Sequence, residues 1–221
     1  MKQIVETTLQ ASLGIQWSTL FVNLFALTRD IPNFHAVLQD VLTIETIVQI
    51  IELIFYTWYA FQIHRIADVT RYRYYDWLIT TPLMLFTTMV YFEYRSSTEK
   101  TTLKEFWDKY WKEVLLVGFC NLWMLGFGFL QEIGKIGLVA STTFGFAGLF
   151  GSFYIIYEGF ASKSPVNLPL FWFMASVWSF YGVAAWFPIA MKNAAYNILD
   201  IFAKNFYGAY LSYFITTLSN T

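Results

Sequence analysis

Long apolar stretches recur along almost the whole chain, and they constrain the fold more than any other feature. Of the 221 residues, 57% are hydrophobic and only 13% are charged, whereas a soluble domain has about 25% charged residues. Each stretch has roughly the 20 residues that a helix needs to cross a bilayer. The predicted spans are residues 11–28, 36–62, 72–93, 114–133, 137–158, 168–190 and 193–217. We therefore predict an all-α membrane protein, a seven-transmembrane helix bundle forming one domain over residues 1–221.

The remaining composition excludes several classes of protein. A net charge of −1 gives no support for nucleic-acid binding. Cys120 is the single cysteine, which rules out an internal disulfide and a Cys-rich metal site. His35 and His64 lie too far apart in the sequence to suggest a metal site. We expect neither a bound metal nor an enzyme active site.

Charged residues between the predicted spans indicate an orientation. The connections after the first, third and fifth spans hold the larger group of basic residues, namely Arg29, Arg95, Lys100, Lys104, Lys109, Lys112 and Lys163. The opposite side holds Lys2, Arg65, Arg71, Lys135 and Lys192. Basic residues favour the cytoplasmic side of a membrane. We therefore expect the N-terminus outside and the C-terminus in the cytoplasm.

One lysine, Lys204, lies near the middle of the last apolar stretch. A lysine at that depth costs about 2.5 kcal/mol or more, so it is seldom present without a use. Asp200 precedes it by four residues and shares its helix face. A buried amine beside a carboxylate is either a structural ion pair or a lysine in covalent use, such as a Schiff base to an aldehyde. The spacing alone leaves both interpretations open.

The third predicted span carries its own buried charges. Arg73, Asp76 and Thr80 occupy positions i, i+3 and i+7, so they share one helix face. A buried aspartate needs a cation, and Lys204 is the buried cation on another helix. We expect Asp76, Asp200, Lys204 and Arg73 to form a nearly neutral cluster.

A polar stripe marks the second predicted span. Glu45, Gln49 and Glu52 lie at positions i, i+4 and i+7 of an otherwise apolar helix. Facing lipid would cost several kcal/mol, so these side chains must face protein or water. Asn197 and Asn205 add polar groups to the last span. These five residues line either a path for hydrated cations or a closed hydrogen-bond network that serves proton transfer.

Three segments, in the right order on the right spans, resemble the microbial (type I) rhodopsins. Arg73–Leu83 resembles their third-helix signature, and Leu199–Lys204 resembles their retinal-binding seventh-helix signature. Trp178–Tyr181 resembles their sixth-helix pocket. The resemblance implies that Lys204 carries covalently bound all-trans retinal as a protonated Schiff base.

The resemblance also implies roles for the residues around that lysine. Asp76 would be the primary counterion and proton acceptor, Asp200 the second counterion, and Arg73 a further member of the counterion cluster. The other expected retinal-binding residues are Trp77, Thr80, Trp178 and Tyr181. The two tryptophans would flank the polyene of retinal.

The sixth span departs from the family pattern. The family commonly has a proline directly after the tyrosine, and this chain has Gly182 there. Four residues beyond the tyrosine, where the family often has tryptophan, this chain has Ala185. We therefore do not expect the usual contact at the ring end of retinal.

The third span lacks an acid that the proton pumps of the family usually carry seven residues after the position of Thr80. Thr87 stands there and cannot supply a proton as a carboxylic acid does.

The chain looks most like the viral rhodopsins of giant viruses, some of which are light-gated cation channels. We interpret it as such a channel, with Asp76 and Lys204 gating the path. The alternatives are a light-driven outward proton pump and a photosensor with a separate transducer. The expected partners are the lipid bilayer, transported cations or protons, and further copies of the chain.

Overall fold

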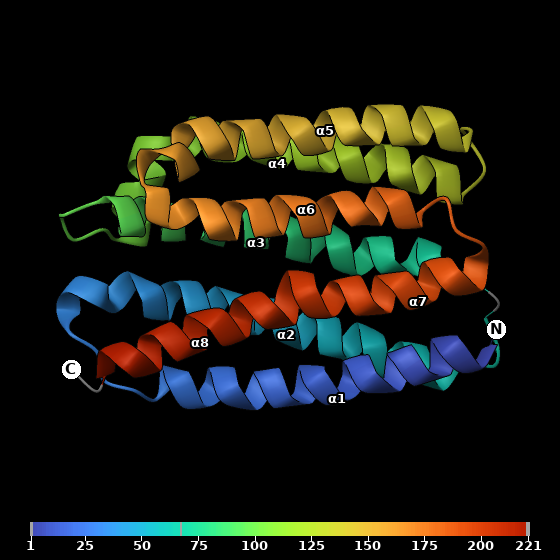
Figure 1. The fold of residues 1–221 in the computed structure, drawn as a ribbon, viewed down its shortest axis with the longest axis horizontal. Coiled ribbons are helices and arrows are strands. Elements are labelled where there is room, and N and C mark those ends of the chain that lie inside the picture. Colours follow the sequence, from blue (N-terminus) through green and yellow to red (C-terminus); the bar gives the residue numbers. More distant parts are fainter. Residues whose placement is uncertain (1, 67, 220–221) are drawn as a thin grey trace.

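The computed structural model describes residues 2–66 and 68–219, and this part of the chain is helical without a strand. Seven helical rods lie alongside one another (Figure 1). The first six are α1 (Lys2–Leu27), α2 (Ala36–Gln62), α3 (Thr70–Ser96), α4 (Leu103–Glu132), α5 (Leu138–Gly159) and α6 (Leu168–Ala184). The chain ends lie at opposite ends of the bundle (Figure 1), as an odd number of crossings requires.

The seventh rod has three parts: α7 (Ile189–Asp200), the π-helical turn η4 (Ile201–Asn205) and α8 (Phe206–Ser219). Short π-helical segments inside longer helices are rare and occur frequently at functional sites. Lys204 lies inside this turn. The local backbone is therefore unusual at the residue for which the sequence predicts chemistry.

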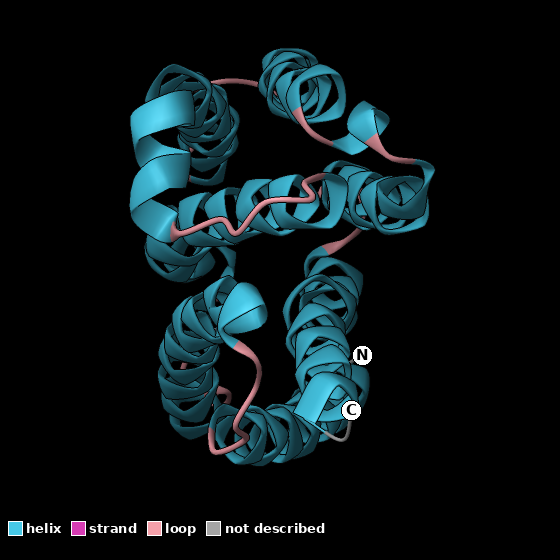
Figure 2. Ribbon diagram, turned by 90° about the vertical axis from the view of Figure 1, so that its left-hand side faces the viewer, coloured by secondary structure: helices cyan, strands magenta, loops and turns pink. Residues whose placement is uncertain are grey.

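The rods form two neighbouring groups. The pair α4 and α5 packs side by side along its length, with α3 against α4. On the other side of the bundle, α1 packs against α2, α7 and α8. The three-residue helices η1 (Asn33–His35), η2 (Ala161–Lys163) and η3 (Pro165–Asn167) occupy links at the bundle ends. Figure 2 shows the rods nearly end-on, joined by short loops.

The outside of the bundle is apolar and its inside contains many polar groups. Large hydrophobic side chains such as Phe21, Ile54 and Phe119 are more than 60% exposed, as expected for a surface that lipid covers. Conversely, Gln16 and Asn23 of α1 are fully buried. Because these inward-facing residues are polar, several rods have a lower mean hydropathy than a uniformly apolar helix. Three described segments are apolar and long enough to cross a membrane by composition alone: Leu103–Glu132, Leu138–Lys163 and Pro165–Ala184.

Several rods have different bounds from the predicted spans, because the prediction followed apolar residues only. The first rod begins at Lys2 instead of residue 11, and α4 begins at Leu103 instead of residue 114. A capping box starts α4: the Thr102 hydroxyl accepts from the Glu105 amide (3.2 Å), and the Glu105 carboxylate accepts from the Thr102 amide (3.0 Å). Charged residues in this segment thus continue the helix.

The sixth rod is shorter than predicted and ends at Ala184 instead of residue 190. Pro188 lies shortly beyond this end and is the N-cap of α7. Proline has no amide hydrogen to donate and disfavours helical backbone in the residue before it. The seventh rod consequently begins at Ile189, four residues before its predicted start.

Close packing of α4 against α5 depends on a glycine. A Cβ atom added at Gly148 would lie 2.6 Å from the Cys120 carbonyl oxygen and 2.9 Å from the Met124 amide nitrogen. Both are backbone atoms, so side-chain rotation could not relieve the clash. Small residues permit this kind of approach between membrane helices.

We predict that Gly148→Ala lowers the free energy of unfolding by about 1–3 kcal/mol, the usual cost of overpacking. The measurement is the thermal midpoint of the purified protein followed by circular dichroism. Gly118→Ala is the matched control on α4, because no atom lies within 4 Å of its added Cβ. Equal midpoints for the two variants would contradict the prediction.

Candidate functional site

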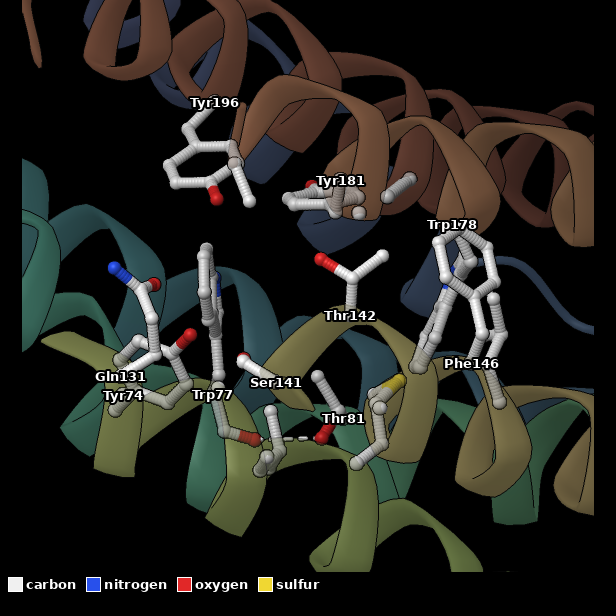
Figure 3. Close-up of a pocket in the computed structure, with 18 of the residues that line it drawn as sticks. Tyr74, Trp77, Thr81, Gln131, Ser141, Thr142, Phe146, Trp178, Tyr181 and Tyr196 are labelled. Carbon is white, nitrogen blue, oxygen red and sulfur yellow. Dashed lines mark hydrogen bonds between the residues drawn. The ribbon is translucent and has the colours of Figure 1, made fainter. Parts of the chain in front are cut away.

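An aromatic cavity lies between α3, α4, α5, α6 and the seventh rod (Figure 3). Its empty volume is about 840 Å³, a figure that includes open space at its mouth. Trp77 and Trp178 stand on opposite sides of this cavity, with Tyr181 and Tyr196 above them in the view of Figure 3. Lys204 is the one lysine among the described lining residues. The cavity therefore places a lysine amine at the edge of a largely apolar site.

Lys204 makes the contacts that the sequence predicts. Its side chain is 3% exposed, and Nζ donates to Asp76 Oδ2 at 2.6 Å. Asp200 Oδ1 lies 3.9 Å from the same nitrogen. Both expected counterions therefore lie beside the amine, although they belong to different helices.

Asp200 is held by three donors. The hydroxyl groups of Tyr56 and Tyr181 donate to its two oxygens, each at 2.6 Å. Arg73 Nη1 donates to Oδ2 at 3.2 Å, and the Arg73 and Asp200 side chains are fully buried. Arg73 Nη2 also donates to the Asn197 side-chain oxygen. Hydrogen bonds to both carboxylate oxygens fix Asp200 as a well-compensated anion.

Tyr56 is a site residue that the sequence interpretation missed. It lies four residues after Glu52 and continues the polar stripe of α2 by one turn. Its fully buried hydroxyl also accepts from Arg73 Nη1 at 3.0 Å. The helical period could have identified this residue, but a tyrosine at that spacing is more often part of an apolar core.

The structure places Glu52 close to Lys204, whereas the sequence interpretation assigned Glu52 only to the ion path. Its Oε1 is 3.8 Å from Lys204 Nζ, and its side chain is fully buried. Neither carboxylate oxygen has a hydrogen-bond partner within the protein. The structure therefore brings a third carboxylate to the cluster of Asp76, Asp200, Lys204 and Arg73.

The other path candidates are also buried, and they lie in pairs. Asn205 Nδ2 donates to Gln49 Oε1 at 2.6 Å, which joins the seventh rod to α2. The Thr87 hydroxyl donates to Glu45, which joins α3 to α2. Asn197 Nδ2 donates to the Thr8 hydroxyl of α1 at 3.0 Å. These side chains therefore close the space between the helices.

Thr80 does not occupy the place expected of it. It is fully buried, and its hydroxyl donates to the Asp76 carbonyl at 2.9 Å. The neighbouring residue, Thr81, does line the cavity. Thr81 accepts from Asn121 Nδ2 at 2.8 Å and donates to the Trp77 carbonyl at 2.7 Å. Thr81 thus lines the cavity, while the Thr80 hydroxyl bonds the backbone of its own helix.

Gly182 shapes another part of the cavity wall. A Cβ atom at this position would lie 2.6 Å from the Phe146 ring. Phe146 of α5 thus occupies space that a side chain at residue 182 would need. Both residues line the cavity, so Phe146 of α5 fills this part of its wall.

A second ionic cluster lies near the start of α7. Lys192 Nζ is 2.9 Å from Glu132 Oε2 and 3.6 Å from Asp68 Oδ2. Burial alone raises the pKa of Asp68, but hydrogen bonds from Thr70 and Asn193 and the charge of Lys192 outweigh it, so the pKa is lowered from its usual value. Asp68 therefore stays ionised at neutral pH and ties the link before α3 to α7.

The family model of bacteriorhodopsin-like proteins matches residues 7–218. The chain belongs to this family. Its structure is similar to that of viral rhodopsin OLPVRII, with a TM-score of 0.87, 25% identity, and coverage of 97% of this chain and 98% of that one. The predicted resemblance to microbial rhodopsins and the predicted seven-helix fold are thus confirmed. No curated protein sequence matches this chain at a significant level.

More distant structures share the fold. A blue light-absorbing proteorhodopsin from Med12 has a TM-score of 0.77 and 17% identity, with coverage of 98% of this chain and 99% of that one. Bromide-bound halorhodopsin from Halobacterium salinarum has a TM-score of 0.74 and 12% identity, with coverage of 99% and 95%. Members of the family are multi-pass membrane proteins that act as photoreceptors, pumps or channels, and they bind retinal covalently through a lysine.

The residues of this chain fit retinal. The amine of Lys204 lies at the wall of a cavity lined chiefly by aromatic and aliphatic side chains. Trp178 Nε1 and Asp76 Oδ1 are buried without a partner in the protein. Asp76 compensates a positive charge at the lysine nitrogen, and the two tryptophans offer flat surfaces to a polyene.

We predict that Lys204→Arg abolishes the visible absorption band of the protein supplied with retinal. Arginine keeps the positive charge beside Asp76, but its guanidinium does not form the bond that an amine forms with an aldehyde. The control is Lys192→Arg at the other buried lysine, where the ion pair with Glu132 is preserved and the band should persist. A visible band in the Lys204 variant would disprove attachment at this residue.

Proposed function

We propose that the protein is a light-gated cation channel whose path lies along the polar stripe of α2. One observation carries this proposal. Glu45, Gln49 and Glu52 follow one another down the inside of the bundle, and each is at most 2% exposed. Gln49 Nε2 and both oxygens of Glu52 lack a partner. We call Glu45, Gln49 and Glu52 the file, and its unpaired atoms are places that water or ions can enter inside a membrane protein.

Light control depends on Lys204, which we propose as the retinal-binding lysine. Retinal, when bound, supplies absorption of visible light and a change of shape about a double bond. Asp76 accepts a hydrogen bond from the lysine nitrogen at 2.6 Å and stabilises the protonated nitrogen in the dark. Asp76 is the group placed to accept the proton of this nitrogen after light absorption, and that transfer would redistribute the charges of the cluster.

The contact between Gln49 and Asn205 couples that change to the path. Asn205 follows Lys204 directly and belongs to the same π-helical turn. Movement of the lysine backbone therefore moves Asn205 and breaks its 2.6 Å hydrogen bond to Gln49. Opening this contact would let water join the polar groups on both sides of it.

The side chains along the proposed path favour cations over anions. Glu45 and Glu52 supply carboxyl groups, while Gln49, Asn197 and Asn205 supply amide oxygens. Oxygen groups of this kind replace the water shell of a cation, and carboxylates repel anions. We therefore propose cations as the transported species.

An outward proton pump is the second candidate, and one contact favours it. The Thr87 hydroxyl of α3 donates to the Glu45 carboxyl group of α2. An acid is thus present at the place where pumps of the family carry one, although a different helix supplies it. In this alternative Asp76 accepts the proton and Glu45 belongs to the resupply route. A photosensor with a separate transducer would produce no current at all.

Other aspects of the assembly remain predictions. The loop charges support an outside N-terminus and a cytoplasmic C-terminus. The single-domain organisation and the homo-oligomer are expected from the sequence and its resemblance. Labelling of each terminus in intact cells and light scattering of the purified protein would test these expectations.

We predict that whole-cell voltage clamp under light, with retinal supplied, gives a current whose sign reverses with the holding potential. The reversal potential should follow the cation gradient, because an open path conducts in both directions. A current that stays outward at every voltage would identify a pump. Absence of current from a coloured protein would indicate a photosensor.

We predict that Glu45→Gln changes the conductance or the ion preference while the absorption maximum shifts little. Glu45 lies in the file and bonds Thr87, but it is not among the groups within 4 Å of Lys204 Nζ. Asp40→Asn is the matched control, since this residue lies on the same helix with an exposed side chain. Unchanged conductance and selectivity in the Glu45 variant would remove it from the path.

A further inference from the structure

We infer that Glu52 stores a proton in the dark and returns it to the Lys204 nitrogen after light has removed one. Glu52 belongs to α2, and its fully buried carboxyl group has Oε1 3.8 Å from Lys204 Nζ. It is one of three carboxyl groups beside this nitrogen, together with Asp76 at 2.6 Å and Asp200 at 3.9 Å. The three groups differ sharply in the hydrogen bonds that they receive.

Hydrogen bonding indicates which carboxyl group carries the proton. Asp76 accepts from Lys204, and Asp200 accepts from Arg73 and from two tyrosine hydroxyls. Glu52 accepts from no group in the protein. A buried ionised carboxylate is far less favourable than the neutral acid when nothing donates to it. Glu52 is therefore the neutral member of the cluster.

The balance of charge leads to the same assignment. Two cations, Arg73 and Lys204, face two hydrogen-bonded anions, Asp76 and Asp200, so this set of four is neutral. An ionised Glu52 would set three carboxylates against two cations in one buried site. One proton on Glu52 removes that repulsion. Two carboxylates that share a site separate in this way into one ionised group and one protonated group.

Asp76 and Glu52 lie on different helices, so one group accepts the proton and the other returns it. Asp76 of α3 takes the proton of the Lys204 nitrogen. In the return step, the O–H bond of Glu52 breaks and an N–H bond forms at that nitrogen, which leaves Glu52 as a carboxylate. Gln49 and Glu45 continue from Glu52 along one face of α2, so a replacement proton reaches Glu52 along the same file.

The step also changes the charge of the proposed ion path. Glu52 is neutral before it gives its proton and negative afterwards, until it is reprotonated. A cation in the file would therefore meet a carboxylate only during the light-driven cycle. The inference rests on the proposed attachment of retinal to Lys204 for the return step, whereas the stored proton is a property of the chain itself.

The stored proton can be tested on the retinal-free protein by infrared spectroscopy. We expect the difference between the wild-type and E52Q spectra to contain the carbonyl stretch of one protonated carboxylic acid. The matched control is E158Q, which removes an exposed glutamate of α5 and should give no such difference. A wild-type minus E52Q difference spectrum without that stretch would overturn the assignment. This measurement needs no retinal, so a failure of attachment at Lys204 is recognised separately.

The return step can be tested on the pigment by flash photolysis. We expect E52Q to recover its dark absorption about 100-fold more slowly than wild type, the lower end of what a positioned proton donor contributes. Sodium azide, which supplies a small diffusible acid, should restore the rate in E52Q. The variant E52D should keep most of it, because an acid is still present. The dark absorption maximum should change little in E52Q, since a neutral group replaces a neutral group.

Contrary outcomes are equally specific. A large shift of the dark absorption maximum in E52Q would mean that Glu52 is ionised and acts as a counterion. Recovery at the wild-type rate in E52Q would mean that another group returns the proton. Slow recovery that azide does not restore would mean that Glu52 only shapes the site.

Discussion

The charge of one buried lysine determines what the rest of the bundle must provide. Lys204 Nζ is 2.6 Å from Asp76, which places α3 against the seventh rod. Asp200 then needs donors of its own, and α2, α3 and α6 supply them through Tyr56, Arg73 and Tyr181. Each partner is buried in turn, so breaking one contact would leave an uncompensated charge in a medium of low dielectric constant. The inward faces of four rods are therefore specified together.

Sequence spacing predicted those parts of the site that lie on a single helix. The four-residue step from Asp200 to Lys204 follows directly from the helical period, and the signature segments added retinal. Spacing could not place Glu52 beside Lys204, because that contact joins α2 to the seventh rod across 152 positions of the chain. It also could not show that Thr81 lines the cavity and Thr80 does not, because the rotation of α3 about its own axis determines how two adjacent residues are placed.

The prediction of helix bounds and of membrane spans was limited for a related reason. The predicted spans followed apolar residues, whereas α4 begins in a charged segment that a capping box stabilises. In the opposite sense, α1 and α2 have polar stripes that reduce their mean hydropathy, although their outer faces are apolar. Both observations arise because a helix is defined by its backbone hydrogen bonds and a membrane span by the side chains that face lipid.

The π-helical turn at Ile201–Asn205 has a consequence for the second half of the seventh rod. Such a turn accommodates one residue more than an α-helical turn, so it shifts the angular position of every later residue by about 100°. Ser212 of α8 is hydrogen-bonded at 2.9 Å to Asn23 of α1 in this shifted phase. A chain one residue shorter in this turn would point Ser212 away from α1 and bring an outer, lipid-facing side chain inward. The extra residue thus keeps two halves of one rod in register with different neighbours.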